Sequence, residues 1–211
     1  MPSVASTASV DHWHNEFTST FITKMAIEFN IPTTITLLRI ALIPLLTVVF
    51  YLPWDFSNKA CTLIFIIAGI TDWLDGYLAR RMHMETPFGA FLDPVADKLM
   101  VAMVLVIIVQ QQASAYLAIP AAIIIGREIT IASLREWMAE IGQRATVKVS
   151  QLAKWKTGIQ MLSIGLLLYR EDLFGIPINL LGYVLLYVAA LLTLWSMVNY
   201  LRAAFIAIAK E

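Results

Sequence analysis

The chain has 211 residues, of which 59% are hydrophobic and only 14% charged, and its mean hydropathy is +0.74. A soluble domain of this length does not need so much apolar surface, so the composition indicates an integral membrane protein. Basic and acidic residues balance, so the net charge indicates nothing about partners. For a membrane protein of this kind we expect no nucleic-acid partner. The single cysteine, Cys61, excludes a disulfide framework.

The first 29 residues differ in composition from the rest of the chain. They begin small and polar, and then place Phe17, Phe21, Met25 and Phe29 at steps of four residues, along one face of a helix. We interpret residues 1–29 as an N-terminal extension, and two interpretations of it stay open. It could form a short interfacial helix, or Met25 could be the start, with the preceding residues contributing no chemistry.

Residues 30–211 contain apolar runs of the length that a membrane-spanning helix needs, about 20 residues. We therefore expect an all-α membrane domain with six transmembrane helices. The expected helices cover 33–52, 58–80, 88–111, 115–141, 152–169 and 177–208.

The distribution of lysine and arginine predicts the orientation in the membrane, because basic residues near helix ends stay on the cytoplasmic side. With six spans, the opposite side would hold only Lys59 and Arg170. We therefore expect both termini and the active site to face the cytoplasm. The basic residues on that side would be Lys24, Arg39, Arg80, Arg81, Arg135, Arg144, Lys148, Lys154, Lys156, Arg202 and Lys210.

Four aspartates lie in the second and third expected helices, where buried charge is unfavourable and indicates a functional site. The helical period places Asp72 and Asp75 on one face of the second helix, and Asp93 and Asp97 on one face of the third. Since the connection between the two helices is short, they should be antiparallel neighbours whose acidic faces meet.

Carboxylates gathered in this way repel one another unless cations lie among them. Oxygen ligands without cysteine or histidine suit Mg²⁺ or Mn²⁺, and two ions could clamp the oxygens of a phosphoryl displacement. Gly76, Ala79 and Gly89 share these faces and leave room for a bulky ligand. Alternatively, these small residues only permit close helix packing.

The stretch "DWLDGYLARRMHMETPFGAFLDPVADK" resembles the signature of the CDP-alcohol phosphatidyltransferase family, DxxDGxxARx8GxxxDxxxD. The stretches "NIPTTITLLRIALIP", "REITIASLREWMAE" and "LTLWSMVNYL" extend the resemblance to bacterial members of the family over residues 29 to 205. The signature is matched at every fixed position, namely Asp72, Asp75, Gly76, Ala79, Arg80, Gly89, Asp93 and Asp97.

The resemblance implies transfer of a phosphatidyl group from CDP-diacylglycerol to sn-glycerol 3-phosphate, with release of CMP, in the inner membrane of a bacterium. It implies that Asp72, Asp75 and Asp93 bind metal, and that Asp97 is a metal ligand, the catalytic base or both. The CDP-lipid would be bound by Gly76, Ala79, Arg80 and Gly89. Alternatively, Arg80 only marks the cytoplasmic end of its helix, as basic residues near helix ends do. The sequence leaves open whether the enzyme is a homodimer.

The acceptor phosphate needs a separate basic site. Arg127 and Arg135 lie on the later half of the fourth helix, and Lys154 and Lys156 open the fifth. Arginine presents a planar fork that matches phosphate oxygens, and lysine adds a point charge. Alternatively, Glu128 and Glu136 pair with some of these bases.

Three other functions are compatible with acidic membrane helices. The same chemistry could use another alcohol acceptor. A prenyltransferase would normally carry two separated aspartate-rich motifs, whereas this chain has one continuous motif. A divalent-cation transporter would place its carboxylates near the bilayer midplane between inverted repeats, and no repeat is evident here.

Overall fold

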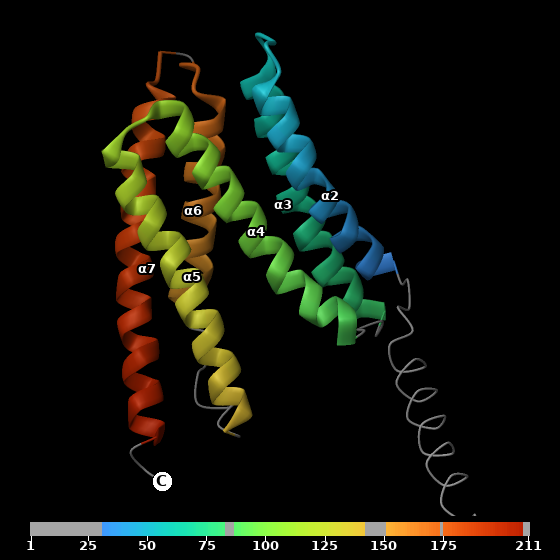
Figure 1. The fold of residues 1–211 in the computed structure, drawn as a ribbon, viewed down its shortest axis with the longest axis vertical. Coiled ribbons are helices and arrows are strands. Elements are labelled where there is room, and N and C mark those ends of the chain that lie inside the picture. Colours follow the sequence, from blue (N-terminus) through green and yellow to red (C-terminus); the bar gives the residue numbers. More distant parts are fainter. Residues whose placement is uncertain (1–30, 83–86, 142–150, 174, 209–211) are drawn as a thin grey trace, which may run out of the picture.

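The computed structural model describes residues 31–82, 87–141, 151–173 and 175–208, and these residues form six α-helices (Figure 1). Every helix begins and ends within two residues of the expected bounds, so the prediction of an all-α fold is confirmed. The proposed interfacial helix in residues 1–29 lies outside the described ranges. The helices are α2 (Ile31–Tyr51), α3 (Ser57–Met82), α4 (Pro87–Gln112), α5 (Ala115–Glu140), α6 (Gln151–Tyr169) and α7 (Ile178–Ile208).

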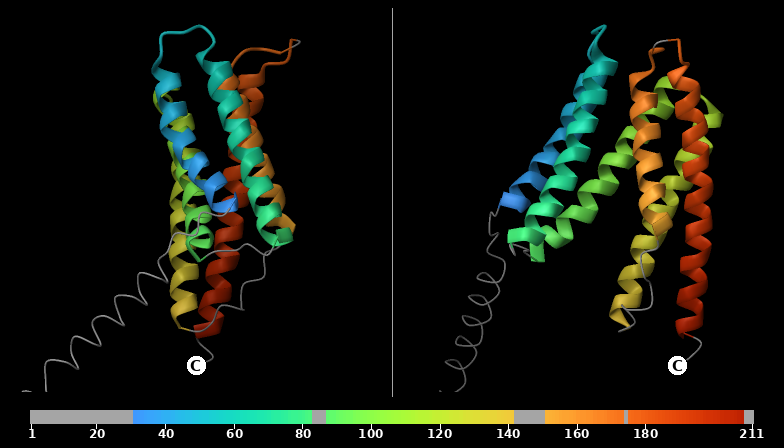
Figure 2. Two further views of the ribbon diagram at one scale, coloured as in Figure 1. Left: turned by 90° about the vertical axis from the view of Figure 1, so that its right-hand side faces the viewer. Right: turned by 180° about the vertical axis from the view of Figure 1, so that it is seen from behind.

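The helices form two antiparallel hairpins bridged by a third pair. The α2–α3 hairpin lies on one side, and the α6–α7 hairpin lies on the other (Figures 1 and 2). Helix α4 packs against α2 and continues across to α5 and α6, while α5 packs against α7 and α3 against α6. Successive helices alternate in direction, so α2, α4 and α6 begin at the end of the bundle where α3, α5 and α7 finish (Figure 1).

A continuous apolar core joins the helices. Leu46, Leu105, Ile124, Leu167 and Leu186, each from a different helix, have at most 1% of their surface exposed. Helices α6 and α7 pack extensively along each other, and Ser163 donates a hydrogen bond to the carbonyl of Gly182. A Cβ at Gly182 would lie 2.8 Å from Leu167, so this contact requires glycine.

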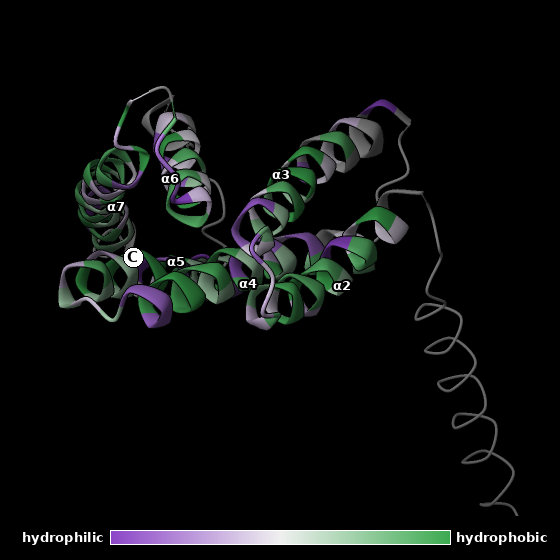
Figure 3. Ribbon diagram, turned by 90° about the horizontal axis from the view of Figure 1, so that it is seen from above, coloured by the Kyte–Doolittle hydropathy of each residue, from purple (hydrophilic) through white to green (hydrophobic). Residues whose placement is uncertain are grey.

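Many hydrophobic side chains are exposed on the outside of the helices, and Figure 3 shows how hydrophobic residues dominate the helices in end view. Val48, Val106, Leu191, Trp195 and Phe205 are among the large hydrophobic side chains that are exposed. So many exposed hydrophobic side chains suit contact with lipid. By length and composition, three of the described helices could cross a membrane: α2, α5 and α7.

The last turn of α4 holds three consecutive glutamines, and we call this region the glutamine end (Gln110–Gln112). Each glutamine has a side-chain partner on a different helix. Tyr51 of α2 donates to Gln110, and Gln111 donates to Asn58 of α3 over 3.3 Å. Gln112 bonds to α7, donating to Asn179 and accepting from the hydroxyl of Tyr183. Neutral hydrogen bonds thus join α4 to three neighbours at this end.

Candidate active site

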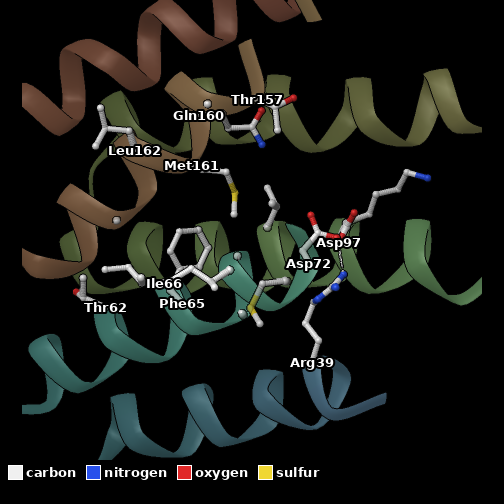
Figure 4. Close-up of a pocket in the computed structure, with 18 of the residues that line it drawn as sticks. Arg39, Thr62, Phe65, Ile66, Asp72, Asp97, Thr157, Gln160, Met161 and Leu162 are labelled. Atoms are coloured by element: carbon white, nitrogen blue, oxygen red, sulfur yellow. Dashed lines mark hydrogen bonds and ion pairs between the residues drawn. The ribbon is translucent and has the colours of Figure 1, made fainter. Parts of the chain in front are cut away.

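A cavity of about 1170 Å³ runs between α3, α4 and α6 (Figure 4). One part is polar and lies beside the signature aspartates, whereas the remainder is lined mainly by apolar side chains of α3 and α6. The polar part includes Arg39, Asp72, Asp93, Asp97, Glu128 and Arg135. The apolar part includes Phe65, Ile66, Met161, Leu162, Leu166 and Leu173. The cavity therefore has the polarity of an amphiphile with a charged head.

Three signature aspartates from two helices line this cavity: Asp72 of α3, and Asp93 and Asp97 of α4. We call this group the acidic cluster. The helical period explains the pair on α4, because residues four apart lie on one face. About half of the side-chain surface of Asp72 and of Asp97 is exposed, at 47% and 48%. These carboxylates can therefore be reached by a ligand.

A buried arginine joins the two helices of the acidic cluster. Nη1 of Arg39, on α2, lies 2.9 Å from Oδ1 of Asp72 and 2.6 Å from Oδ1 of Asp97 (Figure 4). Three residues earlier, the hydroxyl of Thr36 donates a hydrogen bond to Oδ1 of Asp93. The acidic faces of α3 and α4 do converge, as expected, but they converge on a cation supplied by α2.

The sequence interpretation missed this role of α2 and counted Arg39 only as a cytoplasmic anchor. Thr33, Thr36 and Arg39 recur every three residues, and each is 1% exposed. A polar row on an otherwise apolar helix was the signal that could have revealed the contact, because such side chains need buried partners.

The remaining signature positions are described to different extents. Gly76 and Gly89 lie on α3 and α4 and are partly buried. Asp75, Ala79 and Arg80 belong to α3, but their side chains lie outside what the structure describes.

Among the described side chains, no group of three carboxylates, histidines or cysteines is already arranged around a metal position. Two carboxylates share Arg39, and the third is held by Thr36. The donors are nevertheless hard oxygens that already converge on a positive charge, which fits Mg²⁺ or Mn²⁺ rather than a softer metal.

Three of the predicted acceptor residues, Arg127, Arg135 and Lys156, form a second, basic cluster, and Arg135 lines the same cavity as the acidic cluster. Arg127 and Lys156 are buried and share Oε1 of Glu128, at 2.8 and 3.1 Å. Arg127 also donates to Ser196 of α7. The alternative, that Glu128 pairs with some of these bases, therefore holds for Arg127 and Lys156.

Arg135 is the most accessible member of the basic cluster, because it is exposed and lines the cavity. Its guanidinium lies over the ring of Tyr200, 5.6 Å from the ring centre, and donates to the Tyr200 hydroxyl. The side chain of Lys154, on α6, lies outside the described part. Arg127, Arg135 and Lys156 carry more positive charge than Glu128 neutralises, so the described cluster attracts anions.

Comparison with known proteins agrees with this arrangement. Residues 29–195 match the family described as CDP-alcohol phosphatidyltransferase, whose members generally use divalent metal ions. A Haemophilus influenzae protein is 53% identical, over 84% of this chain and 94% of its own length. A Pseudomonas fluorescens protein is 54% identical, over 83% of this chain and 90% of its own length.

Both relatives are named CDP-diacylglycerol–glycerol-3-phosphate 3-phosphatidyltransferase, as is a Salmonella choleraesuis protein that is 52% identical over 84% of this chain. The family match covers well over half of the sequence and includes the whole signature and all six helices in whole or in part. The resemblance drawn from the signature is therefore confirmed, and the chain belongs to the CDP-alcohol phosphatidyltransferase family.

Proposed function

We propose that this protein transfers the phosphatidyl group of CDP-diacylglycerol to sn-glycerol 3-phosphate, giving phosphatidylglycerophosphate and CMP. The observation that carries the proposal is the amphiphilic cavity, whose charged part contains the acidic cluster together with Arg135 of the basic cluster. A CDP-lipid needs apolar walls for its acyl chains and cations for its diphosphate. A phosphorylated acceptor needs a basic site within reach of the same diphosphate. The names of the relatives support this pair of substrates.

The acidic cluster is the proposed metal site. Asp72, Asp75, Asp93 and Asp97 would hold two Mg²⁺ or Mn²⁺ ions, and Gly76, Ala79, Arg80 and Gly89 would lie against the CDP-lipid. When bound, the cations would neutralise the diphosphate and stabilise the charge that develops on the leaving CMP. The support from the structure is that three of these carboxylates line one cavity and two are half-exposed.

Asp97 is the proposed base as well as a ligand. The acceptor hydroxyl oxygen attacks the phosphorus that bears diacylglycerol, the bond from that phosphorus to CMP breaks, and the hydroxyl proton passes to a carboxylate oxygen of Asp97. A base must come within hydrogen-bond reach of that hydroxyl. The hydrogen bond from Arg39 to Asp97 is accepted by Oδ1, and Oδ2 is the proposed proton acceptor.

The basic cluster is the proposed site of the acceptor phosphate, with Arg135 as its most accessible member and Arg127, Lys154 and Lys156 around it. Arg127 is 8% exposed, and its Nε has no hydrogen-bond partner within the described residues. A buried donor without a partner is unfavourable, so an anion that reached it would be bound more tightly.

We also propose the arrangement in the cell. The family match begins at residue 29, in agreement with a catalytic domain of residues 30–211 that follows an extension. Six spans, with both termini in the cytoplasm of a bacterium, would put the basic residues on the cytoplasmic side. The acidic cluster would then be open to glycerol phosphate from water and to CDP-diacylglycerol from the bilayer.

Purified protein reconstituted with CDP-diacylglycerol and Mg²⁺ tests the function. Labelled glycerol 3-phosphate, serine and inositol phosphate are offered as competing acceptors, and CMP release is measured together with the lipid product. We expect product from glycerol 3-phosphate and none from the D93N variant. If the enzyme prefers another acceptor, that acceptor replaces glycerol 3-phosphate as the proposed substrate. Metal flux across sealed vesicles without CMP release would indicate a transporter.

A further inference from the structure

Helix α2 contacts both of the helices that carry the acidic cluster. In the described chain it packs along both α3 and α4, whereas α3 and α4 do not pack extensively against each other. The distance between Asp72 and Asp97 is therefore not set by direct contact of their own helices. It depends on a group that reaches both of them.

Arg39 is that group. It contacts Oδ1 of Asp72 and Oδ1 of Asp97 through a single nitrogen, and it is 1% exposed while both carboxylates are about half-exposed. Arg39 lines the same cavity as both carboxylates, but its guanidinium reaches them from α2 and is almost completely covered by protein (Figure 4). One turn away on the same face, Thr36 holds Asp93 through Oδ1.

We infer that Arg39 and Thr36 are positioning residues, which fix Asp72, Asp93 and Asp97 at the separation that the divalent cation requires. Packing of helices does not need such a contact, because neutral side chains join α4 to its neighbours at the glutamine end. A buried arginine is unfavourable in an apolar helix unless its partners need it. Residues that orient metal ligands commonly change metal affinity or activity by about 10- to 100-fold when they are replaced.

The inference rests on the proposed metal role of the aspartates, and its test measures metal binding directly. Mn²⁺ is titrated into the purified full-length protein and free Mn²⁺ is followed by electron paramagnetic resonance, alongside kcat and KM. Arg39→Met should weaken Mn²⁺ binding by about 10- to 100-fold, and Arg39→Lys should recover part of the loss. Unchanged or tighter binding in Arg39→Met would overturn the inference, since Arg39 would then be only a counter-charge that competes with the metal.

Thr36→Val provides a second test that preserves side-chain shape. We expect about tenfold weaker Mn²⁺ binding, at the lower end of the same range. The matched control is Thr47→Val on the same helix, because the Thr47 hydroxyl donates only to the carbonyl of Ile43 in its own helix. Size-exclusion chromatography and the circular dichroism signal of the helices show whether Arg39→Met folds. If it does not fold, Mn²⁺ binding by Thr36→Val becomes the test of the inference. Equal binding in the two threonine variants would then refute the inference.

The Asp93→Asn variant separates this inference from the proposed function. If Asp93→Asn binds Mn²⁺ as the parent protein does, the metal site itself is wrong. If Asp93→Asn loses Mn²⁺ and Arg39→Met does not, the metal site stands and the positioning role of Arg39 is refuted.

Discussion

The two ends of α4 are both polar, and both are joined to neighbouring helices through side chains. At the glutamine end, the partners are neutral amides and phenols. At the other end, Asp93 and Asp97 meet a hydroxyl and a buried guanidinium. The same helix thus uses neutral hydrogen bonds at one end and full charges at the other.

This difference separates what folding requires from what chemistry requires. Neutral hydrogen bonds suffice to join α4 to α2, α3 and α7 at the glutamine end. Charged groups in an apolar bundle are far less favourable, and they do not pack helices better than neutral ones. The charges of the acidic cluster are therefore best explained by a ligand. Substitutions at the two ends should therefore differ. Those in the acidic cluster should lower activity, and those at the glutamine end should lower stability.

The largest expected effect is that of Asp72→Asn or Asp93→Asn. Each change keeps the shape of the side chain but removes a negative oxygen from the proposed metal site. A metal contributes several kcal/mol of charge stabilisation, so turnover should fall by about a thousandfold or more. The measurement is CMP release across a Mg²⁺ titration, with Gln110→Leu as the control at the opposite end. Full activity at ordinary Mg²⁺ in either variant would exclude the metal assignment.

Asp97→Asn should give a different pattern, because Asp97 is also the proposed base. General-base catalysis typically contributes about 10²- to 10⁴-fold, so kcat should fall within that range. Binding of CDP-diacylglycerol should fall much less. Equilibrium binding of labelled CDP-lipid and steady-state kinetics separate the two quantities. Parallel losses that high metal concentrations restore would make Asp97 chiefly a ligand.

The helices were predictable because each apolar run is bounded by a polar break. All six were located from the sequence to within two residues. Membrane topology was less accessible: within the described residues, α2, α5 and α7 are long and apolar enough to cross a membrane by themselves. Helices that carry a site lose part of the hydropathy signal to the site's own charges, as α3 and α4 do with their aspartates.

The sequence also predicted which aspartates form the acidic cluster, but it did not predict which residues of other helices contact them. Helical periodicity reports which residues share a face of one helix, and it placed Asp93 with Asp97 correctly. It does not report which third helix lies against that face. The ion pairs of Arg39, and the sharing of Glu128 by Arg127 and Lys156, depend on contacts between helices distant in sequence.

The next effect in size concerns the basic cluster. Arg135→Ala should lower kcat/KM for glycerol 3-phosphate by about 10- to 100-fold or more, because a charge-assisted hydrogen bond to a partly desolvated phosphate contributes about 1.5 to 3 kcal/mol. CDP-lipid binding should change little. The two substrates are varied separately to obtain both constants. Loss of CDP-lipid binding instead would assign Arg135 to the other substrate.

Arg127→Ala should lower the same constant for the acceptor and should also destabilise the protein, since Glu128 and Ser196 lose a buried partner. Thermal unfolding in detergent distinguishes the two effects. Normal KM and kcat in both arginine variants would make these residues structural, and the acceptor phosphate would then bind elsewhere.

The smallest effect should come from the glutamine end. Gln112→Leu removes the partner of both Asn179 and the Tyr183 hydroxyl, which links α4 to α7. Hydrogen bonds between helices in membrane proteins contribute about 0.6 kcal/mol on average, so the free energy of unfolding should fall by about 1 kcal/mol for the two contacts. Because no charge near the acidic cluster changes, kcat per folded molecule should stay at the parent value. Denaturant-induced unfolding in detergent measures the first quantity, and CMP release at saturating substrates measures the second. A folded Gln112→Leu protein that lost turnover as completely as Asp93→Asn would show that the two ends of α4 do not divide stability from chemistry.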